Sequence, residues 1–284
     1  MTSTAPENRY AVIGNPIEHS RSPFIHQEFG RQTGIALQYD RILAPVDNFA
    51  HSVKQFFDQG GRGLNVTLPF KEAACALAAE NLSSRAQLAG AVNTLWMDDG
   101  RLHGCNTDGV GLLSDIRRLG VTLAGRKVLL LGAGGAAKGV LLPLLQARCA
   151  QLHIANRSAQ RAYDLRERAI RVAPRRAERL SAGALDAIVG PWDVVINATS
   201  SSLGTATLNL PDTLYAPGAL AYDMMYGAQA TSFLLQARAH GASVLADGLG
   251  MLVGQAAASF AIWHRVQPKV EPVLAALRQQ LQHT

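Results

Sequence analysis

The feature that most constrains the fold is an apolar segment that runs directly into a glycine-rich one. Residues 126–131 (RKVLLL) are apolar after the first two, which is typical of a strand buried on both faces of a parallel sheet. Residues 132–137 (GAGGAA) follow with the spacing G-x-G-x-x-A, and a helical pattern comes next. Strand, glycine turn and helix in this order predict a dinucleotide-binding unit; the alternative is a tight turn without a ligand.

Each small residue of this turn has a predicted role. Gly132 permits the tight turn, Gly134 lets the backbone approach a pyrophosphate, and Ala137 allows close packing of helix and strand. The start of the helix presents free N–H groups and the positive end of its dipole to the phosphates.

The next predicted strand, residues 151–155, indicates which dinucleotide is bound. NAD-preferring folds usually carry Asp or Glu at the end of this strand, but here Asn156, Arg157 and Ser158 follow Ala155. The Arg157 guanidinium matches the geometry of a ribose 2′-phosphate, and Arg161 follows one helical turn later. This favours NADP over NAD; the alternative is that Arg157 is a solvated loop residue.

The segment before this unit also alternates between strand and helix patterns, which predicts a parallel α/β unit. This unit also includes a predicted helix start at Ser22-Pro23, with Ser22 as N-cap, and a predicted hairpin around residues 98–100. We expect strands at 9–14, 38–43, 63–68, 91–97 and 101–105, and helices from Ser22 towards Gly30, at 50–59, after Pro69 and at 109–119.

After residue 126 we expect a second series of this kind. Its helices are predicted up to residue 147 and at 159–172, and its further strands at 192–197, 220–224 and 243–246. The last forty or so residues read as helical, with breaks at Pro268 and Pro272. The sequence therefore predicts an α/β protein of two domains: residues 1–110, completed by 248–284, and a Rossmann-type doubly wound domain at 111–247.

Composition excludes several other classes. The net charge of +6 is compatible with anionic ligands, and the basic stretch from 161 to 179 is mixed with acidic residues, so we expect no nucleic-acid surface. The three cysteines (75, 105 and 149) are widely spaced, which argues against a disulfide framework and a metal site, so we expect no metal. The polar N-terminus and the lack of a long apolar run lead us to expect a cytoplasmic protein without a membrane span.

Polar residues cluster at predicted strand ends, where open α/β sheets bind ligands: residues 19–23 (HSRSP), 65–71 (NVTLPFK) and 106–109 (NTDG). Lys71 lies in the first turn of a predicted helix, where a cation is disfavoured, and this hints at a function. The alternative is an exposed lysine. Asp108 and Ser22 could simply be N-caps, and Thr67 and Asn93 could complete backbone hydrogen bonds.

Several stretches together resemble shikimate dehydrogenases. The resemblance spans Tyr10 to about Trp263, with the motifs in the family's order. The chain departs from the family after Tyr226-Gly227, where prolines are often found but this chain has Ala230 and Ser232. The stretches are GNPIEHSRSPFIH, GLNVTLPFKE, AGAVNTL, GCNTDGVG, LGAGGAAKGVLLPLL, ANRS, NATSSS, YDMMYG and DGLGMLVGQAA.

This resemblance implies NADPH-dependent reduction of 3-dehydroshikimate to shikimate by a monomer or homodimer, with Lys71 and Asp108 as the catalytic pair. Alternatives are a quinate/shikimate dehydrogenase that also uses NAD, or a metabolite sensor that kept the fold. The implied substrate-binding residues are Ser20, Ser22, Thr67, Lys71, Asn93, Asp108, Tyr226 and Gln255. Those implied for NADP are Gly132, Ala133, Gly134, Gly135, Ala136, Asn156, Arg157, Arg161, Thr199, Met224 and Gly248, with residues 198–200 beside the nicotinamide.

Overall fold

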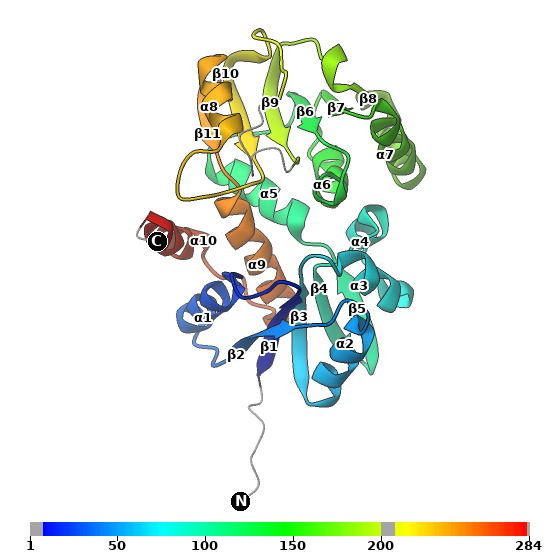
Figure 1. Cartoon of the computed structure of the whole chain (residues 1–284), viewed down its shortest axis with the longest axis vertical. Coiled ribbons are helices and arrows are strands. Elements are labelled where there is room, and N and C mark those ends of the chain that lie inside the picture. The colour runs from blue at the N-terminus through cyan, green and yellow to red at the C-terminus, as the bar shows by residue number, and fades with distance from the viewer. Residues whose placement is uncertain (1–7, 200–207, 283–284) are drawn as a thin grey trace, which may run out of the picture. The chain divides into compact units, whose positions relative to one another are not determined.

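The computed structural model describes residues 8–199 and 208–282 (Figure 1). The chain divides into two compact units, residues 1–111 with 253–277 and residues 112–252 with 278–284. The expected boundaries were near 110 and 247, with all of 248–284 in the first domain. Helices α5 (Asp108–Arg118), α9 (Leu249–His264) and α10 (Val270–Gln282) contain the three dividing points between the units.

The first unit is built on a five-stranded sheet of order β2-β1-β3-β4-β5. The strand β1 pairs in parallel with β2 and β3, whereas β4 pairs antiparallel with both β3 and β5. Asp99 (φ 48°) and Gly100 (φ 72°) connect β4 and β5, as a tight hairpin turn requires. The bounds are β1 Arg9–Gly14, β2 Gln38–Leu43, β3 Gly61–Val66, β4 Thr94–Asp98 and β5 Arg101–Cys105.

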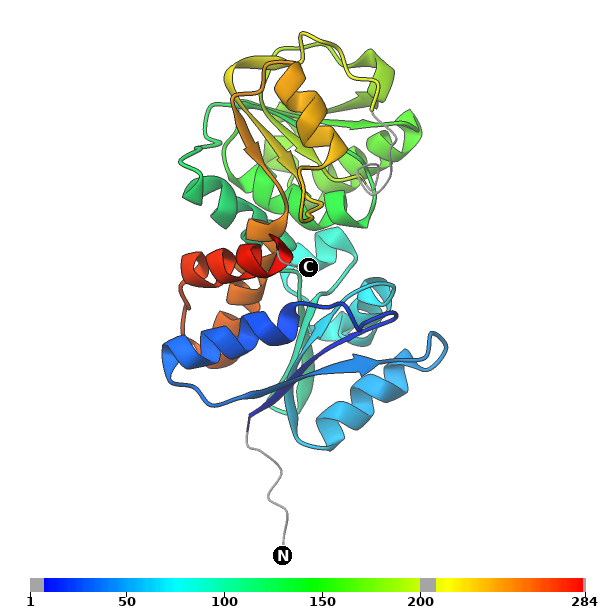
Figure 2. The ribbon, with the colours of Figure 1, turned by 60° about the vertical axis from the view of Figure 1, so that its left-hand side comes forward.

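Helices cover both faces of this sheet, and Figure 2 shows α1 and α2 on opposite sides of it. Alternate residues of β1 explain the arrangement: Ala11 and Ile13 belong to the core on the α2 side, and Tyr10 and Val12 to a second cluster with Tyr39. The helices are α1 Ser22–Thr33, α2 Phe49–Asp58, α3 Lys71–Leu77 and α4 Ser84–Ala89, with a short 3-10 turn at Ala79–Asn81.

Several expectations for this unit were wrong in detail, among them the strand expected at 91–97, which is β4 at Thr94–Asp98. Ser22 is not the N-cap of α1: Arg21 occupies that position without a side-chain cap, and Ser22 is already helical, with Pro23 next to it in the first turn. The strand β3 begins and ends two residues earlier than expected, because Thr67 already starts a turn in which its carbonyl accepts from the Phe70 N–H at 3.0 Å.

The second unit contains a six-stranded, wholly parallel sheet of order β11-β10-β9-β6-β7-β8. Counted within this unit, the order is 6-5-4-1-2-3, the Rossmann arrangement, and the strand order reverses between β6 and β9. The bounds are β6 Lys127–Leu131, β7 Gln151–Asn156, β8 Leu180–Ala184, β9 Trp192–Asn197, β10 Tyr215–Asp223 and β11 Val244–Ala246.

Sequence patterns missed some elements of this unit. The strand β8 (LSAGA) has few β-branched or aromatic residues, and it pairs with β7 through its backbone. Pro272 does not break the last helix but lies in its first turn, where a missing N–H costs little. The helices are α6 Gly135–Gln146, α7 Ala159–Val172 and α8 Ser232–Ala239 (also missed), with 3-10 turns at Pro174–Arg179 and Leu185–Ala187. The last helix, α10 Val270–Gln282, lies mostly in the first unit.

Among residues 8–199 and 208–282, every helix is too short or too polar to cross a bilayer. Within the same ranges, no three His, Cys, Asp or Glu side chains gather as a metal site would need.

His26 of α1 is buried in an aromatic cluster of the first unit. Its ring stacks on Tyr39 with centroids 4.3 Å apart, and Phe29 and Trp263 lie close by. Burial lowers the pKa of His26 from 6.5 to about 3. The native state therefore holds this ring neutral over a pH range in which the unfolded chain binds a proton.

This pKa difference predicts acid sensitivity. Since the unfolded state alone is protonated at His26 between pH 6.5 and about 3, stability rises with pH in that window. The free energy of unfolding should fall by about 2 kcal/mol from pH 7 to pH 5 on account of this group. Urea unfolding at both pH values measures this loss. For His26→Phe, the fall in the free energy of unfolding should be smaller by about 2 kcal/mol than for wild type, and the exposed His51→Gln serves as the control. An equal fall in wild type and His26→Phe would contradict the prediction.

Candidate active site

Three chain segments of the first unit meet at one edge of its sheet. Because β4 runs antiparallel to β3, its first residue, Thr94, is paired with Asn65 near the carboxyl end of β3. Thr94 is also paired with Cys105, the last residue of β5. The residues that follow β3, precede β4 and follow β5 therefore lie together, and they include Lys71, Asn93 and Asp108.

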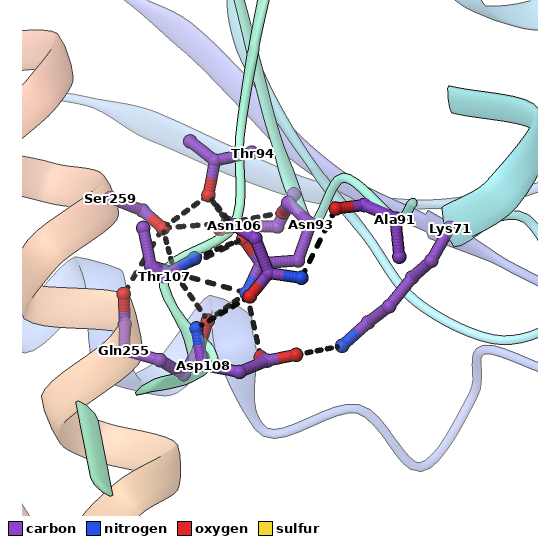
Figure 3. Close-up of polar contacts among 10 residues, drawn as sticks. Lys71, Ala91, Asn93, Thr94, Asn106, Thr107, Asp108, Gln255 and Ser259 are labelled. Carbon is purple, nitrogen blue, oxygen red and sulfur yellow. Dashed lines mark hydrogen bonds and ion pairs between the residues drawn. The ribbon is translucent and has the colours of Figure 1, made fainter. Parts of the chain in front are cut away.

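Lys71 and Asp108 form an ion pair at this edge, with Lys71 Nζ 2.8 Å from Asp108 Oδ2 (Figure 3). Lys71 is the first residue of α3, and Asp108 is the first residue of α5. The side chains are 29% and 11% exposed, so the pair is shielded while the ammonium remains reachable. A shielded pair with one accessible cation can exchange a proton with a bound molecule.

The other oxygen of Asp108 is held by an amide. Asn93 Nδ2 donates to Asp108 Oδ1 at 2.8 Å. The N–H of Asp108 donates to Asn106 Oδ1 at 3.1 Å, so Asn106 provides the side-chain acceptor at the start of α5. The reading of Asp108 as a simple N-cap is therefore wrong: its carboxylate faces Lys71 and Asn93.

Asn93 is the centre of the polar cluster and is only 3% exposed. Its Oδ1 accepts from the Thr107 N–H at 2.9 Å, and this backbone donor fixes the orientation of the amide. The Nδ2 atom thereby faces Asp108 and also lies 3.3 Å from Gln255 Oε1 of α9. Asn93 does more than complete a strand end, since its side chain joins β4, α5 and α9.

The remaining residues expected in the first unit occupy less connected positions. Ser20 Oγ accepts from the Ser22 N–H at 3.3 Å, and the two hydroxyls are also 3.3 Å apart. Thr67 follows β3, and its N–H donates to the Ile13 carbonyl at 3.0 Å. Tyr226 belongs to the second unit, after β10.

In the second unit, the glycine turn lies at the point where the strand order reverses. Gly132 follows β6 with φ 106°, a conformation that glycine adopts without strain. A side chain on it would meet Thr199, which follows β9, at 3.1 Å. A Cβ on Gly134 would meet no atom within 4 Å, and no side chain caps α6 there. Open space before uncapped N–H groups fits a pyrophosphate.

The end of β7 fits the rest of an NADP molecule. Asn156 Nδ2 donates to the Ser158 carbonyl at 2.9 Å, which shapes the turn before α7. Arg157 and Arg161 are both exposed, and neither side chain has a hydrogen bond or ion pair to another described residue. Two available guanidinium groups beside this strand end can bind a phosphate.

Residues around β9 and β10 complete the second-unit site. Asn197 Oδ1 accepts from the N–H and hydroxyl of Thr199, at 3.1 and 2.7 Å. Asp223 accepts from Asn197 Nδ2 at 3.1 Å and from the Thr231 hydroxyl at 2.6 Å. The Gly248 N–H donates to the Met225 carbonyl at 2.9 Å, and a side chain on Gly248 would collide with Met224. Ser200, expected beside the nicotinamide, lies outside the described residues.

Sequence reasoning overlooked the buried partners of these residues. Thr94 and Ser259 are 0% exposed, and Asn197 and Asp223 are equally buried. Each lies close in sequence to a residue that was predicted to be functional, such as Asn93 or Thr199. The sequence alone, however, does not show which hydrogen-bond partner a polar residue in an apolar stretch will have. A polar residue at a fully buried strand or helix position was the available signal.

Comparisons with known proteins agree with this geometry. Residues 12–95 match the model of the shikimate dehydrogenase substrate binding domain, 116–208 that of shikimate / quinate 5-dehydrogenase, and 248–278 that of the shikimate 5'-dehydrogenase C-terminal domain. The chain is 62% identical to shikimate dehydrogenase (NADP(+)) of Bordetella petrii over 283 residues, 99% of each chain.

Solved structures show the same relationship. The Ael1 enzyme from Pseudomonas putida is 46% identical, with a TM-score of 0.88 over 95% of this chain and 98% of that one. Shikimate 5-dehydrogenase from Thermus thermophilus, solved in complex with NADP(H) and shikimate, is 33% identical, with a TM-score of 0.84 over 96% of this chain and 100% of that one.

Proposed function

The chain belongs to the shikimate dehydrogenase family, and on that basis we propose that it catalyses the reversible NADPH-dependent reduction of 3-dehydroshikimate to shikimate. It is thus an NADP-dependent oxidoreductase that acts on a CH–OH group. The observation that carries this proposal is the Lys71–Asp108 pair, because it places a protonated amine beside a fixed carboxylate in the unit matched by the substrate-binding model.

Lys71 and Asp108 divide the proton chemistry between them. Bound NADPH supplies a hydride to the ring ketone carbon. Lys71 donates a proton to the oxygen as it becomes an alkoxide, and in the oxidation direction the same amine takes the proton back. Asp108, held by Asn93 at 2.8 Å, keeps the lysine in place and hydrogen-bonds the substrate in the same region.

Other polar groups hold the substrate and the cofactor. We assign the substrate hydroxyls and carboxylate to Ser20, Ser22, Thr67, Asn93, Tyr226 and Gln255. Gly134 and the start of α6 receive the pyrophosphate, and Arg157 with Arg161 receives the 2′-phosphate; the open space and the exposed guanidinium groups support this. Further residues assigned to NADP are Ala133, Gly135, Ala136, Asn156, Thr199, Met224 and Gly248. We further propose a cytoplasmic monomer or homodimer.

Initial rates should decide the reaction. Shikimate and quinate are each paired with NADP and with NAD, and formation of the reduced cofactor is measured by absorbance. We expect a high rate only for shikimate with NADP, and low rates for the pairs that contain quinate or NAD. Comparable rates with quinate or NAD would place the protein among broader quinate/shikimate dehydrogenases. Inactivity with all four pairs would reject the enzyme proposal and favour a metabolite sensor.

Removal of the proposed proton donor should slow the chemistry. Lys71→Ala is expected to lower kcat by about 10²-fold or more, the usual contribution of general acid–base catalysis. Steady-state kinetics in both directions measures this effect. The control is Lys54→Ala, which removes an exposed lysine paired with Asp58 on α2. A near-normal kcat in Lys71→Ala would rule out the proposed role.

Loss of the two arginines should change cofactor preference. The double variant Arg157→Ala/Arg161→Ala is expected to raise KM for NADP by about tenfold or more, because charge-assisted hydrogen bonds to the phosphate are lost. The KM for NAD should change little, since NAD lacks that phosphate. Arg171→Ala, an exposed arginine in the last turn of α7, is the matched control. Equal effects on both cofactors would contradict the assignment.

A further inference from the structure

A set of buried polar side chains lies behind Asn93 and comes from four different elements. These are Tyr39 of β2, Asn65 of β3, Thr94 of β4 and Ser259 of α9, each at most 5% exposed. Figure 3 shows Thr94 and Ser259 pointing toward each other on the side of Asn93 away from Lys71. Polar groups that are this buried need hydrogen-bond partners inside the protein.

Backbone groups fix the direction of both amides in this set. Asn65 Nδ2 donates to the Asn93 carbonyl at 3.1 Å, so Asn65 Oδ1 is turned to Tyr39 and accepts from its hydroxyl at 2.7 Å. The Thr107 N–H fixes Asn93 in the same way, with Nδ2 toward Asp108. A reversed Asn65 would place its Oδ1 against the Asn93 carbonyl, acceptor against acceptor, and a reversed Asn93 would place its Nδ2 against the Thr107 N–H, donor against donor.

The direction begins at Tyr39. Burial raises the pKa of Tyr39 well above its ordinary value, so the phenol stays protonated. Tyr39 has a single proton and gives it to Asn65 Oδ1 at 2.7 Å. Tyr39 is therefore the first donor of this buried set.

The same donor-to-acceptor direction continues from Asn65 through two hydroxyls, those of Ser259 and Thr94. Ser259 Oγ accepts from Asn65 Nδ2 at 3.0 Å and lies 2.7 Å from Thr94 Oγ1. Thr94 Oγ1 donates to Asn93 Oδ1 at 2.9 Å. The competing acceptors for the Ser259 proton are the Gln255 carbonyl at 3.1 Å and the Thr107 hydroxyl at 3.3 Å, both longer contacts. When Ser259 donates to Thr94, every hydrogen bond from Tyr39 to Asn93 is oriented toward Asp108.

We propose that Tyr39, Thr94 and Ser259 are positioning residues: their hydroxyls form a directed hydrogen-bond chain from Tyr39 through Asn65 to Asn93, which holds Asp108 against Lys71. Hydrogen bonds aligned in this way polarise one another. The chain thus couples a buried tyrosine of β2 to the catalytic pair. The inference rests on the proposed function, since it takes Lys71 and Asp108 as the catalytic groups.

A pair of substitutions at Thr94 separates the chain from packing. Thr94→Val keeps the volume and removes the hydroxyl, whereas Thr94→Ser keeps the hydroxyl and removes a methyl group. We expect Thr94→Val to lower kcat with shikimate about tenfold with KM for NADP within twofold, and Thr94→Ser to stay within twofold of wild type. A merely structural role predicts the reverse order. Unchanged kcat in Thr94→Val, or equal losses in both variants, would overturn the proposal.

A second pair tests the far end of the chain and serves if Thr94→Val does not fold, as judged by its melting temperature. Tyr39→Phe should lower kcat/KM for shikimate about fivefold or more. Tyr10→Phe is the control, because Tyr10 is the β1 partner of Tyr39 in the same cluster but stands outside the chain. Equal values for both variants would overturn the proposal. Wild-type inactivity would instead refute the proposed function, so the two failures are distinguishable.

Discussion

The hydrogen bond from the Thr107 N–H to Asn93 Oδ1 is the constraint on which the candidate site depends. A backbone donor cannot turn, so it sets the Asn93 amide in one orientation and directs Nδ2 at Asp108. With one carboxylate oxygen held by this amide, the other is left for Lys71 at 2.8 Å. The charged pair thus owes its geometry to a neutral group buried behind it, where a low dielectric strengthens each bond.

Sheet topology explains why these groups meet at all. The reversal from parallel to antiparallel pairing at β4 brings the start of that strand, and the end of β5, to the carboxyl edge of β3. Residues far apart in the chain, such as Lys71 and Asp108, then share one edge. In the second unit, the reversal of strand order between β6 and β9 does the same for Gly132 and Thr199. Each site follows from where strands end, a general property of open α/β sheets.

Most elements could be predicted because their patterns are local. The RKVLLL strand with its glycine turn and the Asp99-Gly100 hairpin are defined by neighbouring residues and match the structure closely. Predictions failed where tertiary contacts decide. The strand β8 has weak strand propensity and is held by pairing with β7, and Ser22 is helical because Arg21 takes the cap position. The end of β3 differs from the prediction because a turn, and not strand propensity, determines where this strand ends.

The sequence by itself determined the fold class, the dinucleotide turn, the absence of a carboxylate after β7 and, through ordered motifs, the family. Neighbouring residues determine these properties, because the conformation of a glycine and the spacing of apolar residues depend on only a few positions. Only the tertiary structure decided that Asp108 faces Lys71 instead of capping its helix, and that Tyr39, Asn65, Thr94 and Ser259 form one chain. The physical reason is that a buried polar group takes whichever partner the packing supplies, and packing joins residues that no local pattern connects.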